Sequence, residues 1–174
     1  MSNLSTEKEL LMQNPMDDTR HSNDSPLNWE VSTVDAAQYL ITLIDDDSFI
    51  TEEQLHQLLF VAQTTLWRDK GEVFISEEFK NAGHFAQATP LAELLEPIKP
   101  EALSDSDNEL RFDNESYIGG SISGLGVGDR KWLSHIMDCH IKNAPAWRLA
   151  EICAKSPVLN RVGYGEVVDF FPAG

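Results

Sequence analysis

The stretch Thr51–Gly71, TEEQLHQLLFVAQTTLWRDKG, carries the strongest helix signal in the chain. Thr51, with Gln54 three residues later, forms a capping-box pattern that satisfies free N–H groups where a helix begins. The apolar residues that follow recur at helical spacing and form a stripe wide enough for a buried helix: Leu55, Leu58, Leu59, Val61, Ala62, Leu66 and Trp67. Gly71 supplies a helix stop. We therefore expect a long buried helix over residues 52–69.

Further helices are predicted on both sides of this stretch. Similar stripes indicate helices over residues 33–44, 130–142 and 145–154, and a short helix begins around Pro90. Asp129 is the expected cap of the helix over residues 130–142. The predicted core consists of Leu58, Leu59, Ala62, Leu66, Leu133, Ile136, Trp147 and Ile152. The expected fold is mainly α, a single compact helical domain with short β segments and an N-terminal tail.

The segments between these helices suggest the domain boundaries. Residues 1–30 are rich in Asn, Asp, Ser and Pro and are predicted to form a flexible tail, or else an arm that orders when it binds a partner. The domain itself is expected over residues 31–171. Short β segments are expected at residues 73–75 and 166–171, and the long polar and glycine-rich connection over residues 101–128 is expected to be a mobile loop.

Charge is the most pronounced feature of the composition. The 174 residues include 13 Lys and Arg but 29 Asp and Glu, which gives a net charge of −16. Residues 31–103 alone carry a net charge of −9. This balance argues against binding nucleic acid through its phosphates, and against binding an anionic membrane surface. It favours a basic partner, although acidity that serves solubility alone is the simpler alternative.

The chain also lacks the sequence features of a membrane or secreted protein. No stretch approaches the ~18 apolar residues of a membrane span, and the first residues lack the basic start and apolar run of a signal peptide. Two cysteines are too few for a disulfide framework. A cytoplasmic location is therefore expected.

No sequence motif for catalysis, phosphate binding or metal binding stands out. The glycines over residues 119–128 lack the Lys and Ser or Thr of a phosphate-binding loop. His135 and Cys139 share a helical face and His140 is close, but a third well-spaced metal ligand is missing. His56 is predicted to be a packed core histidine. We expect no catalytic residue, no metal and no cofactor, and we expect that the protein is not an enzyme, with an enzyme on this scaffold as the alternative.

Two blocks of sequence, over residues 32–79 and 129–157, follow a recognisable pattern. In the first block the matching residues are Val34, Ala36, Ala37, Tyr39, Leu40, Ile50, Leu55, Leu58, Leu59, Phe60, Ala62, Gln63, Gly71, Phe74, Glu77, Glu78 and Phe79. The second block, DRKWLSHIMDCHIKNAPAWRLAEICAKSP, is similar to a closing pair of helices. Together they resemble the Panacea domain, also called the SocA-like antitoxin domain, and LLFVAQ is the most specific part of the match.

The chain departs from the family pattern on what would be one surface. The family's A-W-x-x-G-P-V segment is replaced by NAGHFAQATP, residues 81–90. Gln57 stands where a basic residue is usual, and the closing T-H and P-W pairs are replaced by Cys153-Ala154 and Pro157-Val158. The helices thus follow the family while the segment after the two glutamates does not.

The resemblance implies an antitoxin-like protein that neutralises a protein toxin by stoichiometric binding. Family members occur in toxin–antitoxin pairs and on phages, and one relative delivers its toxin to a protease. The alternative is a phage or mobile-element anti-defence protein, an acidic nucleic-acid mimic that inhibits a nuclease or CRISPR effector. In both cases the expected partner is a basic protein.

The rewritten segment between Glu77 and Pro90 is the predicted partner-binding site. Aromatic side chains there would anchor the interface, and nearby acids would form a rim that steers a basic partner. The predicted site residues are Glu72, Glu77, Glu78, Phe79, His84 and Phe85. The alternative for Phe79 and Phe85 is that both point inward and close the core.

Overall fold

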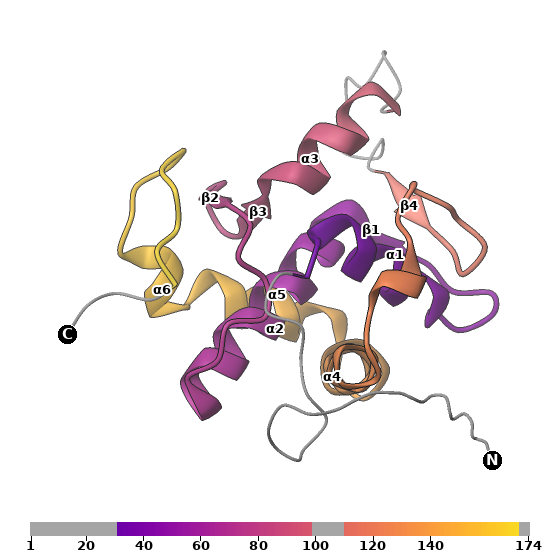
Figure 1. Ribbon diagram of the computed structural model, residues 1–174. Coiled ribbons are helices and arrows are strands. Elements are labelled where there is room, and N and C mark those ends of the chain that lie inside the picture. The colour runs from indigo at the N-terminus through magenta and orange to yellow at the C-terminus, as the bar shows by residue number, and fades with distance from the viewer. Residues whose placement is uncertain (1–30, 99–109, 171–174) are drawn as a thin grey trace.

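The computed structural model describes residues 31–98 and 110–170, and this part of the chain is mainly helical, as expected (Figure 1). The elements are α1 (Thr33–Thr42), β1 (Ile50–Thr51), α2 (Glu52–Lys70), β2 (Phe79–Asn81), β3 (Ala86–Ala88), α3 (Thr89–Leu95), η1 (Glu96–Ile98), β4 (Arg111–Phe112), η2 (Ile122–Gly124), α4 (Val127–Met137), η3 (Asp138–Lys142), α5 (Ala146–Ala154) and α6 (Pro157–Asn160). Strand β1 pairs antiparallel with β4, and β2 pairs antiparallel with β3.

Helix α2 is the centre of the fold. Helices α1, α4 and α5 and strand β3 all contact it, and Figure 1 shows them arranged around it. The predicted capping box is present: Thr51 N–H donates to Oε1 of Gln54 at 2.9 Å, and Gln54 N–H donates to Oγ1 of Thr51 at 3.1 Å. Gly71 ends the helix in the left-handed conformation, with a φ of 65°. Local sequence signals therefore set both ends of α2.

The core forms around the apolar stripe of α2. Leu55, Leu58, Leu59 and Leu66 are fully buried or nearly so. Beside them an aromatic cluster joins three segments that are distant in sequence, since Phe60, Phe79 and Phe170 lie with ring centroids 5.2 to 6.4 Å apart. Burial of aromatic rings in such tilted arrangements stabilises the packing beyond the area removed from water. This cluster ties the β2–β3 hairpin and the C-terminal segment to α2.

Buried amide side chains hold the irregular segments against the helices. Oε1 of Gln63 accepts hydrogen bonds from the N–H groups of Phe74 and Ile75, at 2.7 and 2.6 Å. Gln38 on α1 does the same for the segment before α4, because its side chain accepts from Ile118 N–H at 2.7 Å and donates to Ser116 O at 3.0 Å. Buried peptide groups outside helices and sheets need such partners.

Two predicted β segments differ from expectation. Residues 73–75 form no strand, because the side chain of Gln63 takes the backbone N–H groups that a neighbouring strand would need. Among the described residues of the segment over residues 166–171, Val167 forms an isolated bridge to Lys80 of β2, which is far away in sequence, and no strand of its own is formed.

The C-terminal helices also differ in detail. Helix α4 begins at Val127 rather than after Asp129, because the Asp129 carboxylate reaches back to the N–H of Gly126 at 2.8 Å. It ends at Met137 and continues as the π-helical turn η3.

Of the connection predicted to be mobile, residues 110–128 contain β4, η2 and the start of α4. The remainder, like the predicted tail over residues 1–30, lies outside the described residues.

Trp147 and Ile152 are not core residues, contrary to the prediction. Trp147 is 64% exposed and Ile152 is 38% exposed. The buried face of α5 is defined by Leu149 and Cys153, which are one helical turn apart. At 3.6 residues per turn, Trp147 lies on nearly the opposite side of the helix from Leu149.

Within the described residues, no helix combines the length and apolar character needed to cross a membrane.

Replacement of Leu59 tests the assignment of α2 as the central helix. Leu59 is fully buried, so Leu59→Ala should lower the free energy of unfolding by about 2–5 kcal/mol. Leu94→Ala is the matched control, because Leu94 is 40% exposed and should lose about 1 kcal/mol or less. Urea unfolding followed by circular dichroism measures both. Equal losses for the two variants would contradict the assignment.

Candidate functional site

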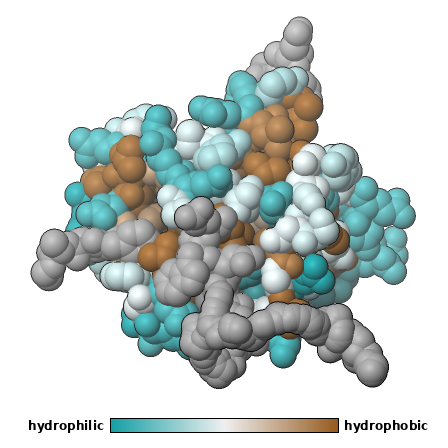
Figure 2. Space-filling view, viewed as in Figure 1, coloured by the Kyte–Doolittle hydropathy of each residue, from teal (hydrophilic) through white to brown (hydrophobic). Residues whose placement is uncertain are grey.

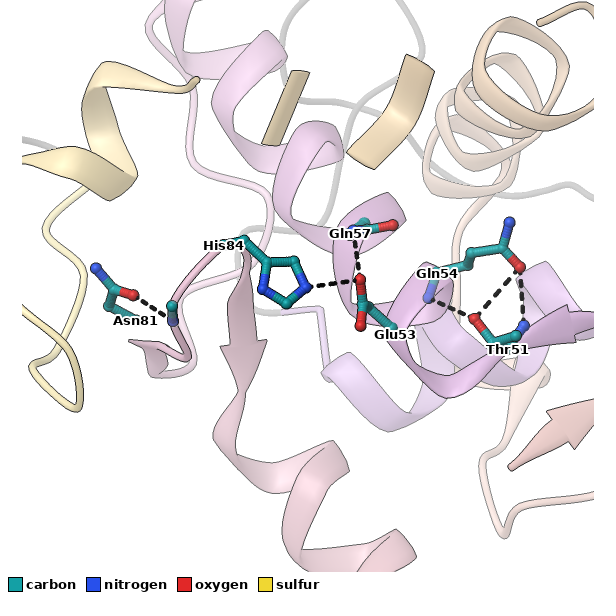
Figure 3. Close-up of polar contacts among 7 residues, drawn as sticks. Thr51, Glu53, Gln54, Gln57, Asn81 and His84 are labelled. Atoms are coloured by element: carbon teal, nitrogen blue, oxygen red, sulfur yellow. Dashed lines mark hydrogen bonds and ion pairs between the residues drawn. The ribbon is translucent and has the colours of Figure 1, made fainter. Parts of the chain in front are cut away.

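The β2–β3 hairpin and its turn contain most of the rewritten segment. Phe79 pairs with Ala88 and Asn81 pairs with Ala86, which leaves a tight turn over residues 82–85. Asn81 shapes this turn because its Oδ1 accepts a hydrogen bond from Gly83 N–H at 2.7 Å (Figure 3). Its Nδ2 donates to Val162 O at 2.9 Å. One buried side chain thus fixes both the turn and the neighbouring C-terminal segment.

The tip of the hairpin contacts the first turn of α2. His84 Nε2 lies 3.1 Å from Oε2 of Glu53, and Gln57 donates to the same oxygen at 3.2 Å (Figure 3). The ring of Phe85 lies between the rings of two histidines, with centroids 5.2 Å from His84 and 6.0 Å from His56. The hairpin tip is therefore held in place, while the side chain of His84 remains 64% exposed.

His56 anchors the hairpin from below and is fully buried. Its Nδ1 accepts a hydrogen bond from Ala88 N–H at 3.0 Å. Nδ1 therefore carries no proton, so the opposite nitrogen, Nε2, donates to Oε2 of Glu52 at 3.1 Å. Both ring nitrogens are thus used in packing, which agrees with the interpretation of His56 as a core histidine.

Two of the predicted site residues have structural roles instead. Phe79 is 1% exposed and belongs to the aromatic cluster, because the alternation of β2 turns Phe79 inward and Lys80 outward. Phe79 therefore closes the core, which is the alternative stated for it in the sequence analysis. The Glu77 carboxylate accepts from Thr33 N–H at 2.7 Å and Thr33 Oγ1 at 2.8 Å, so it stabilises the start of α1.

The other predicted residues divide into two locations. Glu78, His84 and Phe85 lie on or beside the hairpin, and Glu78 is exposed and accepts from Thr89 Oγ1 at 2.8 Å. Glu72 is half-buried and follows the far end of α2. Since α2 has 19 residues and is roughly 28 Å long, Glu72 is distant from the hairpin tip at the opposite end. Glu72 therefore does not belong to the same surface.

Sequence analysis missed an exposed tyrosine beside the hairpin. Tyr164 is 81% exposed, and its ring would lie 3.9 Å from a Cβ atom placed on Gly83. Val167, which is 51% exposed, pairs with β2 at Lys80. In the orientation of Figure 2, hydrophobic residues gather at the left over the C-terminal segment that follows α6. The only local signal for Tyr164 is its position between two glycines, which is typical of an exposed loop tip.

These residues together form one surface with an apolar centre and an acidic edge. Tyr164, Val167 and the half-buried Phe85 supply the apolar part, and the ring of His84 lies beside that of Phe85. The exposed Lys80 lies opposite Val167 and pairs with Glu78 at 3.6 Å. We call this the hairpin surface, and its members are Glu53, Glu78, His84, Phe85, Tyr164, Glu166 and Val167. The carboxylates at its edge are partly or fully exposed. The arrangement is that of a contact surface.

The thiol nearest to this surface is chemically protected. Cys153 is fully buried and its thiol donates to Gln57 O at 3.8 Å. Burial, together with the nearby Glu53 carboxylate, raises the pKa of Cys153 to about 12. A nucleophilic cysteine needs the opposite shift, because the thiolate is the reactive form. The Glu53–His84 pair therefore has no activated thiol beside it.

The predicted His135–Cys139 pair is present, with His135 on α4 and Cys139 on η3. Cys139 is exposed, and its Sγ lies 3.5 Å from Nε2 of His135. In the part of the chain that the structure describes, no three His, Cys, Asp or Glu side chains are grouped so that they could hold a metal ion. The pair thus supplies two ligands at most.

Comparison with known proteins adds no relative. No family model, no curated protein and no solved structure matches the chain. The resemblance to the Panacea domain remains a prediction, and function is inferred from the surface described above.

The two cysteines should differ sharply in reactivity. At pH 8, a disulfide reagent such as DTNB should modify Cys139 rapidly and Cys153 only after denaturation, because Cys153 is buried and has a pKa of about 12. Absorbance of the released thiolate measures both phases. Cys139→Ser should remove the rapid phase and Cys153→Ser should leave it unchanged. Rapid modification of both thiols in the folded protein would contradict the placement of Cys153.

Proposed function

We propose that this protein is an antitoxin-like inhibitor that neutralises a basic protein toxin by stoichiometric binding through the hairpin surface. The observation that carries the proposal is Tyr164, a large side chain that is 81% exposed beside the hairpin turn. The resemblance of the helices to the Panacea domain supports the antitoxin class. The proposal includes a cytoplasmic protein that acts without catalysis and without a cofactor.

The shape of the hairpin surface suits an interface with a few strong anchors. Tyrosine is enriched among the residues that dominate binding energy, because it buries a large ring and retains a polar hydroxyl. The turn beneath Tyr164 is fixed by Asn81, and His84 is held by Glu53. A surface that is already ordered loses less conformational entropy when it binds, which favours affinity.

Charge supports a basic partner. The net charge is −16, and Glu53, Glu78 and Glu166 lie at the edge of the hairpin surface. Exposed acids at an edge act mainly on the association rate and on specificity, because water and salt screen them in the complex. We therefore assign steering to these carboxylates and most of the affinity to the aromatic centre.

A second acidic surface favours the alternative, an anti-defence protein that imitates nucleic acid. Asp45, Asp46 and Asp47 are exposed in the turn after α1. Asn114 donates to Asp46 Oδ1 at 2.7 Å and so brings the exposed Asp113 and Glu115 beside them. A nuclease groove would bind here through closely spaced carboxylates. A toxin gene beside this gene would favour the antitoxin, and a phage operon of anti-defence genes would favour the mimic.

Replacement of Tyr164 tests the proposed anchor. A tagged protein is used to capture partners from its own host, and the captured proteins are quantified by mass spectrometry. Tyr164→Ala and Phe85→Ala should each speed dissociation of the partner about tenfold or more, which is the usual effect at a binding hot spot. Tyr117→Ala is the matched control, because Tyr117 is 77% exposed on the segment held by Gln38. Undiminished binding by both hairpin variants would refute this site.

Charge reversal at Glu78 tests steering separately. Glu78→Lys should slow association severalfold and weaken its dependence on salt, with little effect on dissociation, because Glu78 is exposed at the edge. Glu151→Lys on α5 is the control for net charge, since it makes the same change away from the hairpin. Asp46→Lys distinguishes the alternative. A larger effect at Asp46 than at Glu78 would favour the nucleic-acid mimic.

A further inference from the structure

A pocket of about 390 Å³ lies on the face shared by α1 and α4, which pack together (Figure 1). Its lining residues are Tyr39, Val127, Arg130, Lys131, Ser134, His135 and Asp138. None of them belongs to the hairpin surface. The volume falls in the range of about 300–1,000 Å³ that is typical of small-molecule sites. The pocket is therefore large enough for a small organic ligand.

The charge of this pocket is opposite to that of the protein as a whole. Arg130 and Lys131 lie side by side, and Asp138 is the single acid in the lining. Among the described residues neither cation forms an ion pair, although carboxylates greatly outnumber cations in this chain. Two unpaired cations that face the same pocket indicate a site for an anion.

The arginine has an unused buried donor. One Nη of Arg130 donates to Ile122 O at 3.3 Å, which fixes the direction of the guanidinium group. Its Nε is buried and has no hydrogen-bond partner. A buried N–H without a partner is costly, so such a group in a native protein calls for an explanation. Because Arg130 also lines the pocket, an anion that binds there would contact the guanidinium group to which this Nε belongs.

Further donors line the same pocket. The hydroxyl groups of Tyr39 and Ser134 lie 3.4 Å apart, one from α1 and one from α4. The ring of His135 lies against Trp132, with centroids 5.6 Å apart, and adds a ring nitrogen. Burial, followed by nearby His135 and Arg148, lowers the pKa of His140 on the adjoining turn η3.

We propose that this pocket binds a small phosphate monoester. A guanidinium, an ammonium and two hydroxyl groups from two helices match the several oxygens of a tetrahedral phosphate, whereas a planar carboxylate would leave some of these donors unused. Val127, which is 60% exposed, and the ring of Tyr39 provide an apolar wall for the organic part of the ester. The site adjoins the end of the glycine-rich segment through Val127, but its charged donors come from α4 and not from a phosphate-binding loop motif.

Adenosine 5′-monophosphate is a suitable probe, with adenosine and inorganic phosphate as its two fragments. Titration of the isotope-labelled full chain, followed by amide chemical shifts, should show saturable changes confined to α4 and the adjoining part of α1. The nucleotide should bind at least about tenfold more tightly than either fragment, because it uses both the charged donors and the apolar wall. Adenosine that binds as well as the nucleotide would overturn the proposal.

Two substitutions change the charge of the pocket in opposite directions, and a third on α5 is their control. Lys131→Gln should weaken nucleotide binding about tenfold, because it removes a charge-assisted contact. Asp138→Asn should tighten binding severalfold, because it removes the single acid that would repel a phosphate. Lys155→Gln on α5 is the control and should leave binding unchanged. Thermal melts confirm folding of each variant, and equal affinities of the Lys131 and Asp138 variants would overturn the assignment.

Discussion

Inside the core, the side-chain carbonyl oxygen of Gln63 accepts two backbone hydrogen bonds at once, from Phe74 and Ile75. The same amide donates to Glu72 O at 3.2 Å, so three backbone groups of the turn after α2 bind to one residue. Buried peptide groups beyond the end of a helix cannot form hydrogen bonds with water. Without a side-chain partner such as Gln63, each would lower the stability of the fold. The chain therefore turns back along α2 at this point. Consequently Glu77 reaches Thr33 at the start of α1, and the hairpin begins at a fixed distance from α2.

The same principle holds the other end of the hairpin. His56 binds the backbone at Ala88, and Asn81 binds the turn on one side and the C-terminal segment on the other. These contacts come from buried side chains, whereas the residues available to a partner, Tyr164 and His84, lie on top of them. The division would allow the exposed surface to change in sequence while the buried contacts stay the same. A substitution at Tyr164 leaves the buried contacts in place, but a substitution at Asn81 would release two segments together.

The sequence predicted the elements whose signals are local. Helix α2 was predicted over residues 52–69 and spans Glu52–Lys70, because its capping box and glycine stop act within a few residues. Trp147 was misassigned since a large aromatic residue on an amphipathic helix says little about which face is packed. The position of the Tyr164 ring beside Gly83 brings together segments about 80 residues apart, and no local pattern encodes it. The site was therefore predicted in part: the hairpin tip was found, but its most exposed aromatic neighbour was missed.

The two proposed sites lie in the same electric field but respond to it differently. A basic partner is attracted by the net charge of −16 from a distance, and the attraction weakens as salt is added because the Debye length falls to about 8 Å at physiological ionic strength. A phosphate monoester is repelled by that same net charge until it comes close to Arg130 and Lys131. Salt screens this long-range repulsion as well as the short-range attraction, so the two effects partly cancel for the small ligand. Ionic strength should therefore strongly affect binding of a basic partner to the hairpin surface and only weakly affect binding of a phosphate monoester to the pocket. One acidic protein can thus bind a basic macromolecule and a small anion at separate sites.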